Sequence, residues 1–236
     1  MCLIAIAHRA SDAFPLVIAA NRDEDHERAT HAAHVWSDAN DVIGGRDALH
    51  GGAWLAIARS GRFAAVTNLR GAAKTPQSRS RGELVRGFVT GADSPYDYAS
   101  RIVPAEYAGF HLLTGEIGGE LVLLSSSLHR LEPGVYGLSN APEGETWPKV
   151  AYAAERLRNA IETLDANALT ADLLRFLATP RGTDDPRHEI FIRGDRYGTR
   201  SSTVIIASAD EITFTEQSWA RGGIVAGAPR TLRFAR

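Results

Sequence analysis

Short apolar runs separated by turn residues dominate the first half of the chain. Each run has six or seven residues, is rich in Val, Ile, Leu, Ala or aromatic residues, and ends at a polar or glycine-containing stretch. Runs of this kind, joined in pairs by a tight turn, are typical of β-hairpins. The paired runs are 2–8 with 15–21, 53–58 with 62–67, and 110–115 with 121–126. The pattern therefore predicts three hairpins.

Helical periodicity is clearest in the second half of the chain. Over residues 146–164 the apolar positions recur three or four residues apart, and Pro148 lies where a first helical turn accepts proline. A second helix is predicted over 169–177. Ser80 and Glu83 have the spacing of a capping box, which predicts that another helix starts there.

The C-terminal part returns to short apolar segments, which predict strands at 188–192, 202–207, 212–215 and 231–234. Residues 21–40 carry charges and histidines at close intervals and are predicted to form a long functional loop or an irregular stretch. The order of strands, helices and strands predicts an α+β fold with mostly antiparallel sheets, because a parallel sheet requires βαβ alternation. No repeat or linker is evident, so we predict a single domain over residues 1–236.

Composition narrows the class of protein. The 236 residues are 44% hydrophobic and 23% charged, as in an ordinary globular chain, and the net charge of −2 argues against a nucleic-acid partner. The early apolar run at 3–7 is too short for a signal-peptide core, and no run approaches the 18 apolar residues of a membrane span. We therefore expect a cytoplasmic protein with no membrane span.

The single cysteine, Cys2, excludes an internal disulfide and a thiolate zinc cage, and we expect no metal site. A lone cysteine is most often a small buried hydrophobic residue. Its position favours a second interpretation, because removal of Met1 would leave Cys2 with a free α-amino group. That amine has an ordinary pKa of about 7.7–8.0, so it is a suitable base for the adjacent thiol.

Several polar residues are candidates for chemistry beside Cys2. The first predicted hairpin returns Asp23 to the start of the chain, where a carboxylate could hold the α-amino group; a solvated acidic turn is the alternative. Asn68 and Asn140 are either turn residues or amide donors to a developing oxyanion. Arg200 precedes a predicted strand and is either a surface charge or a functional arginine.

Seven ordered motifs resemble the NRDE family, whose eukaryotic members are called transport and Golgi organisation protein 2. They are Met-Cys-Leu-Ile at 1–4, Ala-Asn-Arg-Asp-Glu at 20–24, Gly-Gly-Arg-Asp at 44–47, Gly-Gly-Ala-Trp-Leu at 51–55, Val-Thr-Asn at 66–68, Leu-Ser-Asn-Ala at 138–141 and Tyr-Gly-Thr-Arg-Ser-Ser-Thr-Val at 197–204. This family is similar in turn to the N-terminal-nucleophile hydrolases that deacylate bile-acid amides and penicillin V.

The resemblance implies a four-layer αββα sandwich and a set of site residues. Cys2 matches the nucleophile, Asp23 the residue that binds the α-amino group, and Arg200 a late active-site arginine. Asn68 and Asn140 match the oxyanion and amine-positioning asparagines. The same motifs supply candidates for substrate binding, which are Asn21, Arg22, Arg46 and Trp54. The acylases carry an arginine where this chain has Ala20, and Arg22 is the candidate to replace it.

Two functions follow from the resemblance. The first is a cysteine amidohydrolase that cleaves a linear, non-peptide C–N amide bond without a cofactor. The second is a non-enzymatic carrier that uses the same pocket for haem, acyl-CoA or another lipid. The expected partner is therefore a small molecule, an amide in the first case and haem or an acyl-CoA in the second. The sequence leaves the oligomeric state open.

Overall fold

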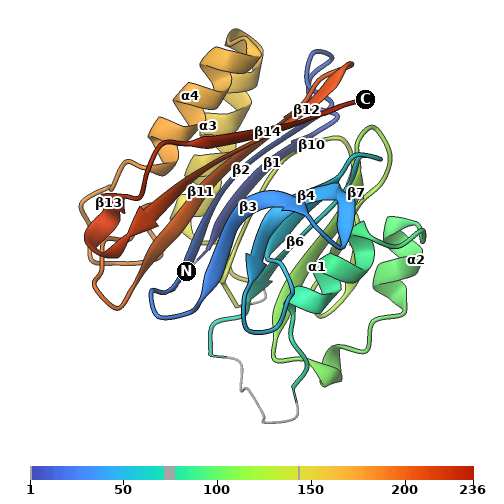
Figure 1. Ribbon diagram of the computed structural model, residues 1–236, viewed down its shortest axis with the longest axis horizontal. Helices are drawn as coiled ribbons and strands as arrows, with labels where there is room; N and C mark the ends of the chain where they lie inside the picture. Colours follow the sequence, from blue (N-terminus) through green and yellow to red (C-terminus); the bar gives the residue numbers. More distant parts are fainter. Residues whose placement is uncertain (1, 72–77, 143) are drawn as a thin grey trace. The chain divides into compact units, whose positions relative to one another are not determined.

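The computed structural model describes residues 2–71, 78–142 and 144–236, which form two compact units, each with its own antiparallel sheet (Figure 1). The first unit comprises the chain up to Arg28 together with Pro133–Ser139 and Thr146–Arg236. The second comprises Ala29–Glu132 and Asn140–Glu145. The α+β class and the antiparallel sheets predicted from the sequence are confirmed.

The sheet of the first unit has seven strands, which combine both ends of the chain. Its order is β10-β1-β2-β11-β12-β13, and β14 also pairs with β12. The strands are β1 (Leu3–His8), β2 (Leu16–Asp25), β10 (Gly134–Ser139), β11 (Tyr197–Ala207), β12 (Glu211–Ala220), β13 (Ile224–Val225) and β14 (Arg230–Ala235). The hairpin of β1 and β2 sets Leu3 opposite Asn21, as predicted, so the residues after Asn21 lie beside the start of β1.

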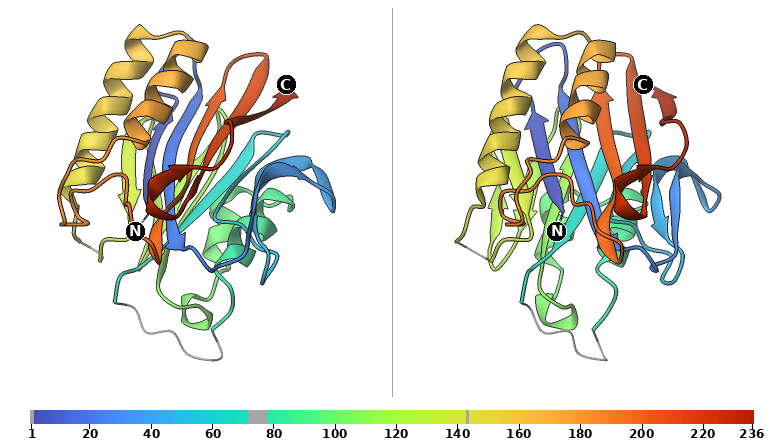
Figure 2. Two further views of the ribbon diagram at one scale, coloured as in Figure 1. Left: turned by 60° about the vertical axis from the view of Figure 1, so that its left-hand side comes forward. Right: turned by 90° about the vertical axis from the view of Figure 1, so that its left-hand side faces the viewer.

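Two helices cover one face of this sheet. They are α3 (Pro148–Thr163), which packs on β1 and β10, and α4 (Ala166–Leu177), which packs on β2 and β11 (Figure 2). The predicted apolar face of α3 is buried, including Val150, Ala153 and Leu157. Helix α4 begins three residues before its predicted start because the carboxylate of Asp165 caps it, accepting from the backbone N–H groups of its first turn.

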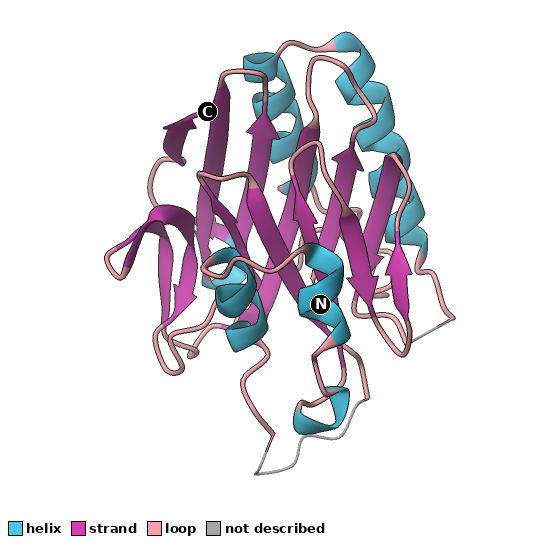
Figure 3. Cartoon of the chain, turned by 90° about the vertical axis from the view of Figure 1, so that its right-hand side faces the viewer, coloured by secondary structure: helices cyan, strands magenta, loops and turns pink. Residues whose placement is uncertain are grey.

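The second unit has a seven-stranded sheet in sequential order, β3 to β9, with α1 (Gly82–Val89) and α2 (Pro95–Ser100) against one face (Figure 3). Its strands are β3 (Thr30–Trp36), β4 (Ala39–Asp47), β5 (Leu55–Ala58), β6 (Arg62–Asn68), β7 (Phe110–Glu116), β8 (Leu121–Leu124) and β9 (Leu128–Arg130). The two other predicted hairpins, β5 with β6 and β7 with β8, are confirmed. A single-turn 3-10 helix in each unit, η1 (Pro104–Glu106) and η2 (Arg221–Gly223), completes the elements.

Three predictions were wrong. Residues 21–40 are not a loop: β2 continues to Asp25 because its polar end pairs residue by residue with β11, and β3 follows. No capping box forms at Ser80, since Arg81 precedes α1 without a side-chain cap and the Glu83 carboxylate binds Arg79 instead. The segment 188–192 is not a strand, for a reason that lies in Glu189 and is given below.

Within the described parts of the chain, no helix is both long enough and apolar enough to cross a membrane.

Candidate functional site

In the first unit the hairpin of β1 and β2 brings Cys2 and Asp23 together. The Cys2 thiol donates to the carbonyl oxygen of Asp23 over 3.8 Å, and the hydroxyl of Tyr197, from β11, donates to the same oxygen over 3.1 Å. Burial raises the pKa of the Cys2 thiol, and the negative charge of Asp23 raises it further, while Arg22 opposes them. Cys2 is therefore a protonated thiol at neutral pH, and a nucleophilic reaction at sulfur requires a base.

The carboxylate of Asp23 is fixed by a short relay. The hydroxyl of Thr199 accepts from the backbone N–H of Ile192 over 2.9 Å and donates to Oδ1 of Asp23 over 2.7 Å. Thr199 reaches Asp23 because β11 carries a bulge: Thr199 pairs with Asp23, Ser201 pairs with Arg22, and Arg200 is the extra residue between them. Because the oxygen of the Thr199 hydroxyl accepts from Ile192, the hydroxyl proton is directed to Asp23. This hydrogen bond holds the carboxylate in one orientation.

A buried lysine that the sequence did not single out also lies in the first unit. Lys149, the second residue of α3, is fully buried, and its Nζ lies 5.6 Å from the centre of the Trp147 ring. Burial lowers the pKa of Lys149, and the nearby acidic groups of Asp23, Cys2 and Glu189 oppose that shift. Lys149 is thus a fully buried cationic side chain at the start of α3.

Glu189 organises the irregular segment before β11. Its carboxylate accepts five backbone N–H groups, which belong to Arg181, Gly182, Thr183, Ile190 and Phe191. Burial raises the pKa of Glu189, but these hydrogen bonds outweigh burial and leave the pKa below its usual value. The predicted strand at 188–192 does not form, because two of its own N–H groups bind this side chain instead of a neighbouring strand.

Asn21 and its neighbours are engaged within the protein. The fully buried amide of Asn21 donates to the carbonyl oxygens of Leu177 and Ile190 and accepts from the hydroxyl of Ser202. Its predicted role in substrate binding stays a prediction, while its structural role is to connect β2 to α4 and to the segment before β11.

Arg22 and Arg200, the two arginines of this region, also interact with other groups of the protein. The buried Arg22 forms an ion pair with Glu24 at 3.6 Å. Nη1 of Arg200 donates to the carbonyl oxygens of Asp25 and Arg28, at 2.9 and 3.2 Å. Burial lowers the pKa of Arg200, and Arg22 contributes in the same direction. Arg200 thus fastens the turn that follows β2.

The second unit carries Asn68 and Asn140. The side-chain amide of Asn140 donates to the carbonyl oxygen of Asn68 over 2.7 Å, and the Asn140 carbonyl accepts from the backbone N–H of Arg70. Oδ1 of Asn140 is buried and has no hydrogen-bond partner among the described residues, so it can accept one further donor. Asn68 itself is exposed at the end of β6.

Arg46 and Trp54 also belong to the second unit. Arg46 donates twice to the carbonyl oxygen of Gly51 and once to Asp38, and its guanidinium lies 4.6 Å from the centre of the Trp36 ring. Trp54 is half-buried just before β5, where its carbonyl accepts from Val66. Arg46 therefore closes the turn between β4 and β5, and its role in substrate binding stays a prediction.

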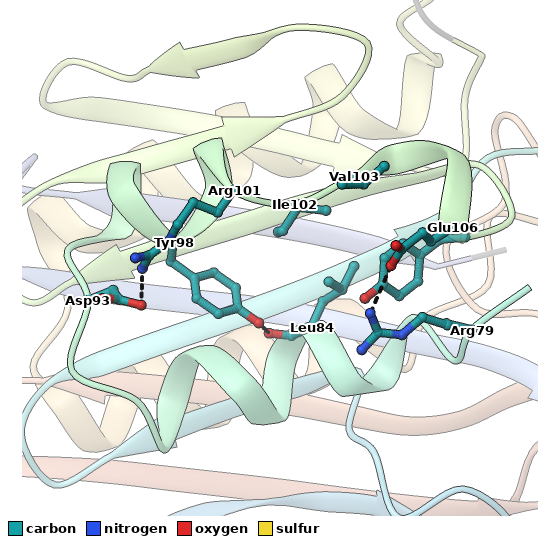
Figure 4. A pocket seen from close by; sticks show the side chains of 9 residues that line it. Arg79, Leu84, Asp93, Tyr98, Arg101, Ile102, Val103 and Glu106 are labelled. Carbon is teal, nitrogen blue, oxygen red and sulfur yellow. Dashed lines mark hydrogen bonds and ion pairs between the residues drawn. The ribbon is translucent and has the colours of Figure 1, made fainter.

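A hollow of about 380 Å³ opens beside α1 and α2, and none of the site residues predicted from the sequence lines it (Figure 4). Its charged groups are paired within the protein, Arg101 with Asp93 and Arg79 with Glu106, and Tyr98 donates to the carbonyl oxygen of Leu84. Paired charges of this kind leave little unsatisfied polarity for a ligand. Among the described residues, no three His, Cys, Asp or Glu side chains lie together as a metal site.

The fold is that of solved N-terminal-nucleophile hydrolases. The Caenorhabditis elegans ortholog of N-acylethanolamine-hydrolyzing acid amidase aligns with a TM-score of 0.52 and 14% identity, over 87% of this chain and 92% of the other. A variant of the conjugated bile acid hydrolase of Clostridium perfringens aligns with a TM-score of 0.59 and 8% identity, over 100% and 96%. At these identities the likeness is one of fold.

The sequence comparisons define the family. The chain belongs to the Transport and Golgi organisation 2 family, whose model matches residues 1–221. It is 34% identical to the Transport and Golgi organization protein 2 homolog of Bos taurus and 31% identical to that of Homo sapiens, in both cases over 89% of this chain and 88% of the relative. The Drosophila melanogaster protein is 28% identical over 92% of each chain.

Proposed function

We propose that this protein is a cysteine amidohydrolase that cleaves a linear, non-peptide C–N amide bond. Cys2 is the nucleophile once Met1, which lies outside the described residues, has been removed. The observation that carries the proposal is the placement of the Cys2 thiol on the carbonyl oxygen of Asp23, with the carboxylate of Asp23 fixed by Thr199. The likeness in fold to an acid amidase and a bile acid hydrolase supports the same reaction class.

The reaction needs a base because burial raises the pKa of the thiol. The α-amino group of Cys2, held by Asp23, takes the thiol proton as sulfur attacks the amide carbonyl. The roles of Asn68 and Asn140 as donors to the resulting oxyanion stay predictions from the sequence. The protonated amine then gives its proton to the departing nitrogen as the C–N bond breaks, and water hydrolyses the thioester to the free acid and the original thiol.

Replacement of the nucleophile tests the proposal. We expect Cys2→Ala to reduce the release of amine from a panel of N-acyl amides by at least about a thousandfold, because no covalent intermediate can form, while the far-UV circular dichroism stays unchanged. A matched control is the wild-type chain with Met1 retained, as measured by intact mass, in which the nitrogen of Cys2 is an amide and cannot act as a base.

Full activity of Cys2→Ala would overturn the proposal. Saturable binding of haem or an acyl-CoA, with no product formed from any amide by either form of the protein, would favour the carrier instead. For haem that binding is measured as a shift of its Soret band.

A further inference from the structure

A second hollow, of about 370 Å³, lies in the first unit on the segment between α4 and β11. The residues that line it are Arg181, Thr183, Asp185 and His188. The start of this segment has a fixed backbone, because the carboxylate of Glu189 accepts the three consecutive N–H groups from Arg181 to Thr183. The fold therefore maintains the hollow, and the proposed reaction does not use it.

The guanidinium of Arg181 is available to an anion. It lies 4.2 Å from the centre of the Tyr152 ring, and that ring in turn contacts Phe176 of α4. Within the described parts of the chain, the side chain of Arg181 forms no ion pair and no hydrogen bond. A guanidinium that lies on a ring keeps N–H groups at its edge for two parallel hydrogen bonds. Arg181 is thus a cation held in place without an anionic partner.

Asp185, the carboxylate that lines the hollow, is neutralised by Arg187. Nε and Nη2 of Arg187 donate to its oxygens over 3.0 and 2.6 Å, and the backbone N–H of Arg187 donates to Oδ1 over 2.9 Å. The charge of Glu189 is bound by backbone N–H groups, and the neighbouring Asp184 does not line the hollow. The charge of Arg181 is therefore not cancelled inside the hollow, in contrast to the paired charges beside α1 and α2 (Figure 4).

Thr183 and His188 add neutral donors to the same hollow. Oγ1 of Thr183 accepts from the backbone N–H of Asp185 over 3.1 Å, which leaves the hydroxyl proton for another acceptor. The imidazole of His188 is exposed and forms no hydrogen bond with the described residues. Even a neutral imidazole carries one N–H donor. Three different side chains thus offer donors to one small volume.

The number of donors and the size of the hollow indicate the chemistry of the ligand. A planar carboxylate has two oxygens, which one guanidinium can bind by itself, whereas a phosphate group has three terminal oxygens and close to two negative charges. Ligand pockets have volumes of about 300–1,000 Å³, so this hollow also has room for the group that carries the phosphate.

We propose that this hollow binds the phosphate monoester group of a small molecule. The guanidinium of Arg181 binds two of the phosphate oxygens, and Thr183 and His188 donate to the phosphate from the other side chains of the hollow. The proposal goes beyond the amidohydrolase reaction and does not depend on it, because binding is measured without turnover.

The test is a titration of ¹⁵N-labelled protein with phenyl phosphate at constant ionic strength, followed through the backbone amide resonances of residues 181–189. We expect saturable shifts in this segment. Benzoate, which carries a carboxylate on the same ring, is expected to bind at least about tenfold more weakly, because it lacks the third oxygen and the second charge. Inorganic phosphate is expected to shift the same resonances with lower affinity, because it lacks the attached group.

Variants identify the residues that bind. We expect Arg181→Met to weaken the binding of phenyl phosphate at least about tenfold, because the charged donor is removed. Arg181→Lys restores only part of the affinity, since an ammonium group does not present a planar pair of donors. His188→Ala weakens the binding less than Arg181→Met does. Both side chains are exposed, so these variants are expected to fold.

A matched control is Arg193→Met. It removes another arginine of the first unit that lies over an aromatic ring, 6.0 Å from the centre of Phe191, but that does not line the hollow. Its affinity for phenyl phosphate is expected to equal that of the wild type.

Three results would overturn the proposal. They are the absence of shifts at residues 181–189 with millimolar phenyl phosphate, equal affinities of the wild type and Arg181→Met, and equal affinities for benzoate and phenyl phosphate. Inorganic phosphate that binds as tightly as phenyl phosphate would overturn the assignment of an ester and leave an adventitious ion only.

Discussion

Two buried carboxylates of the first unit are stabilised in different ways. Asp23 has a side-chain hydroxyl on one oxygen, whereas Glu189 is surrounded by backbone N–H groups. Backbone donors cannot be repositioned without moving the chain, so Glu189 holds the conformation of the segment from Arg181 to Phe191. Asp23 is held by a side chain that can respond to a bound molecule. The first carboxylate therefore belongs to the candidate site and the second to its support.

We expect Glu189→Gln to lower the free energy of unfolding by about 2–4 kcal/mol, because an amide nitrogen replaces one acceptor oxygen and faces backbone donors. Urea denaturation at pH 7 measures the loss, with the exposed Glu162→Gln on α3 as the matched control. The pKa of Glu189 is lowered in the folded protein, so its stabilisation is present above the unfolded value of about 4.3 and is lost as the pH falls through the folded value. A difference from wild type that persists undiminished at pH 2 would contradict this account.

The candidate site could be predicted from the sequence only in part. Cys2 and Asp23 could be placed together because a short hairpin fixes which residues return to its start. Lys149 was missed because it lies within an amphipathic helix, where a lysine is ordinarily exposed. One available signal was that the chain has only two lysines, Lys74 and Lys149, against 24 arginines. The contacts of Asn21 depend on segments far away in the sequence, which no local pattern reports.

At the scale of elements, packing of α3 on the sheet depends on a single glycine. Gly137 lies opposite Ala5 in β1, and its missing side chain leaves room for Val150. An added Cβ would also lie 2.8 Å from the carbonyl oxygen of Val150, which is backbone and cannot turn aside. The first turn of α3 can therefore approach β10 only where there is no side chain.

We expect Gly137→Ala to lower the free energy of unfolding by about 1–3 kcal/mol, since α3 must move away from β10. Gly134→Ala on the same strand is the matched control, because the nearest atom to its added Cβ would be the Tyr136 hydroxyl oxygen, at 3.4 Å. Thermal unfolding of both variants measures the difference. Equal melting temperatures for the two variants would show that the close approach carries no stability.

The hydrophobic pattern of each element explains which elements could be predicted from the sequence. The hairpin strands are continuous apolar runs that are buried almost throughout, and the apolar period of α3 meets a buried face, so their predictions were right. The prediction failed for the C-terminal end of β2, because its residues from Arg22 to Asp25 are polar. Pairing with β11 nevertheless satisfies their backbone groups. Such a strand is stabilised by its neighbour, and the neighbour lies about 175 residues away along the chain.

At the scale of the whole molecule, arginine is the common partner of the acidic residues. In both units arginines lower the pKa values of exposed carboxyls, as Arg187 does for Asp185, whose pKa falls to about 2, and as Arg46 does for Asp38. Pairs as exposed as these contribute little to folding individually. On the alkaline side the ionisable groups of interest are tyrosines, because the surroundings of three of them raise the pKa of the hydroxyl.

We expect two of the six tyrosines, Tyr98 and Tyr197, to remain protonated at pH 10.5 in the folded protein. Burial raises the pKa of Tyr98 to about 12, and it also raises the pKa values of Tyr107 and Tyr197. The folded state therefore keeps protons that the unfolded state loses above pH 10, so stability falls as the pH rises beyond that value. Absorbance at 295 nm during alkaline titration measures this, and a single reversible step near pH 10 for all six would contradict it.

The bulge in β11 decides which kind of group Asp23 faces. Ser201 lies opposite Arg22, so a strand without the extra residue would set Arg200 opposite Asp23. Opposed residues of an antiparallel pair project to the same face, and a guanidinium there would neutralise the carboxylate. The bulge instead sets a hydroxyl beside Asp23 and directs Arg200 to the carbonyl oxygens of Asp25 and Arg28. The one inserted residue thus keeps the Arg200 guanidinium away from the Asp23 carboxylate. The negative charge of Asp23 can then interact with an amine or an ammonium group.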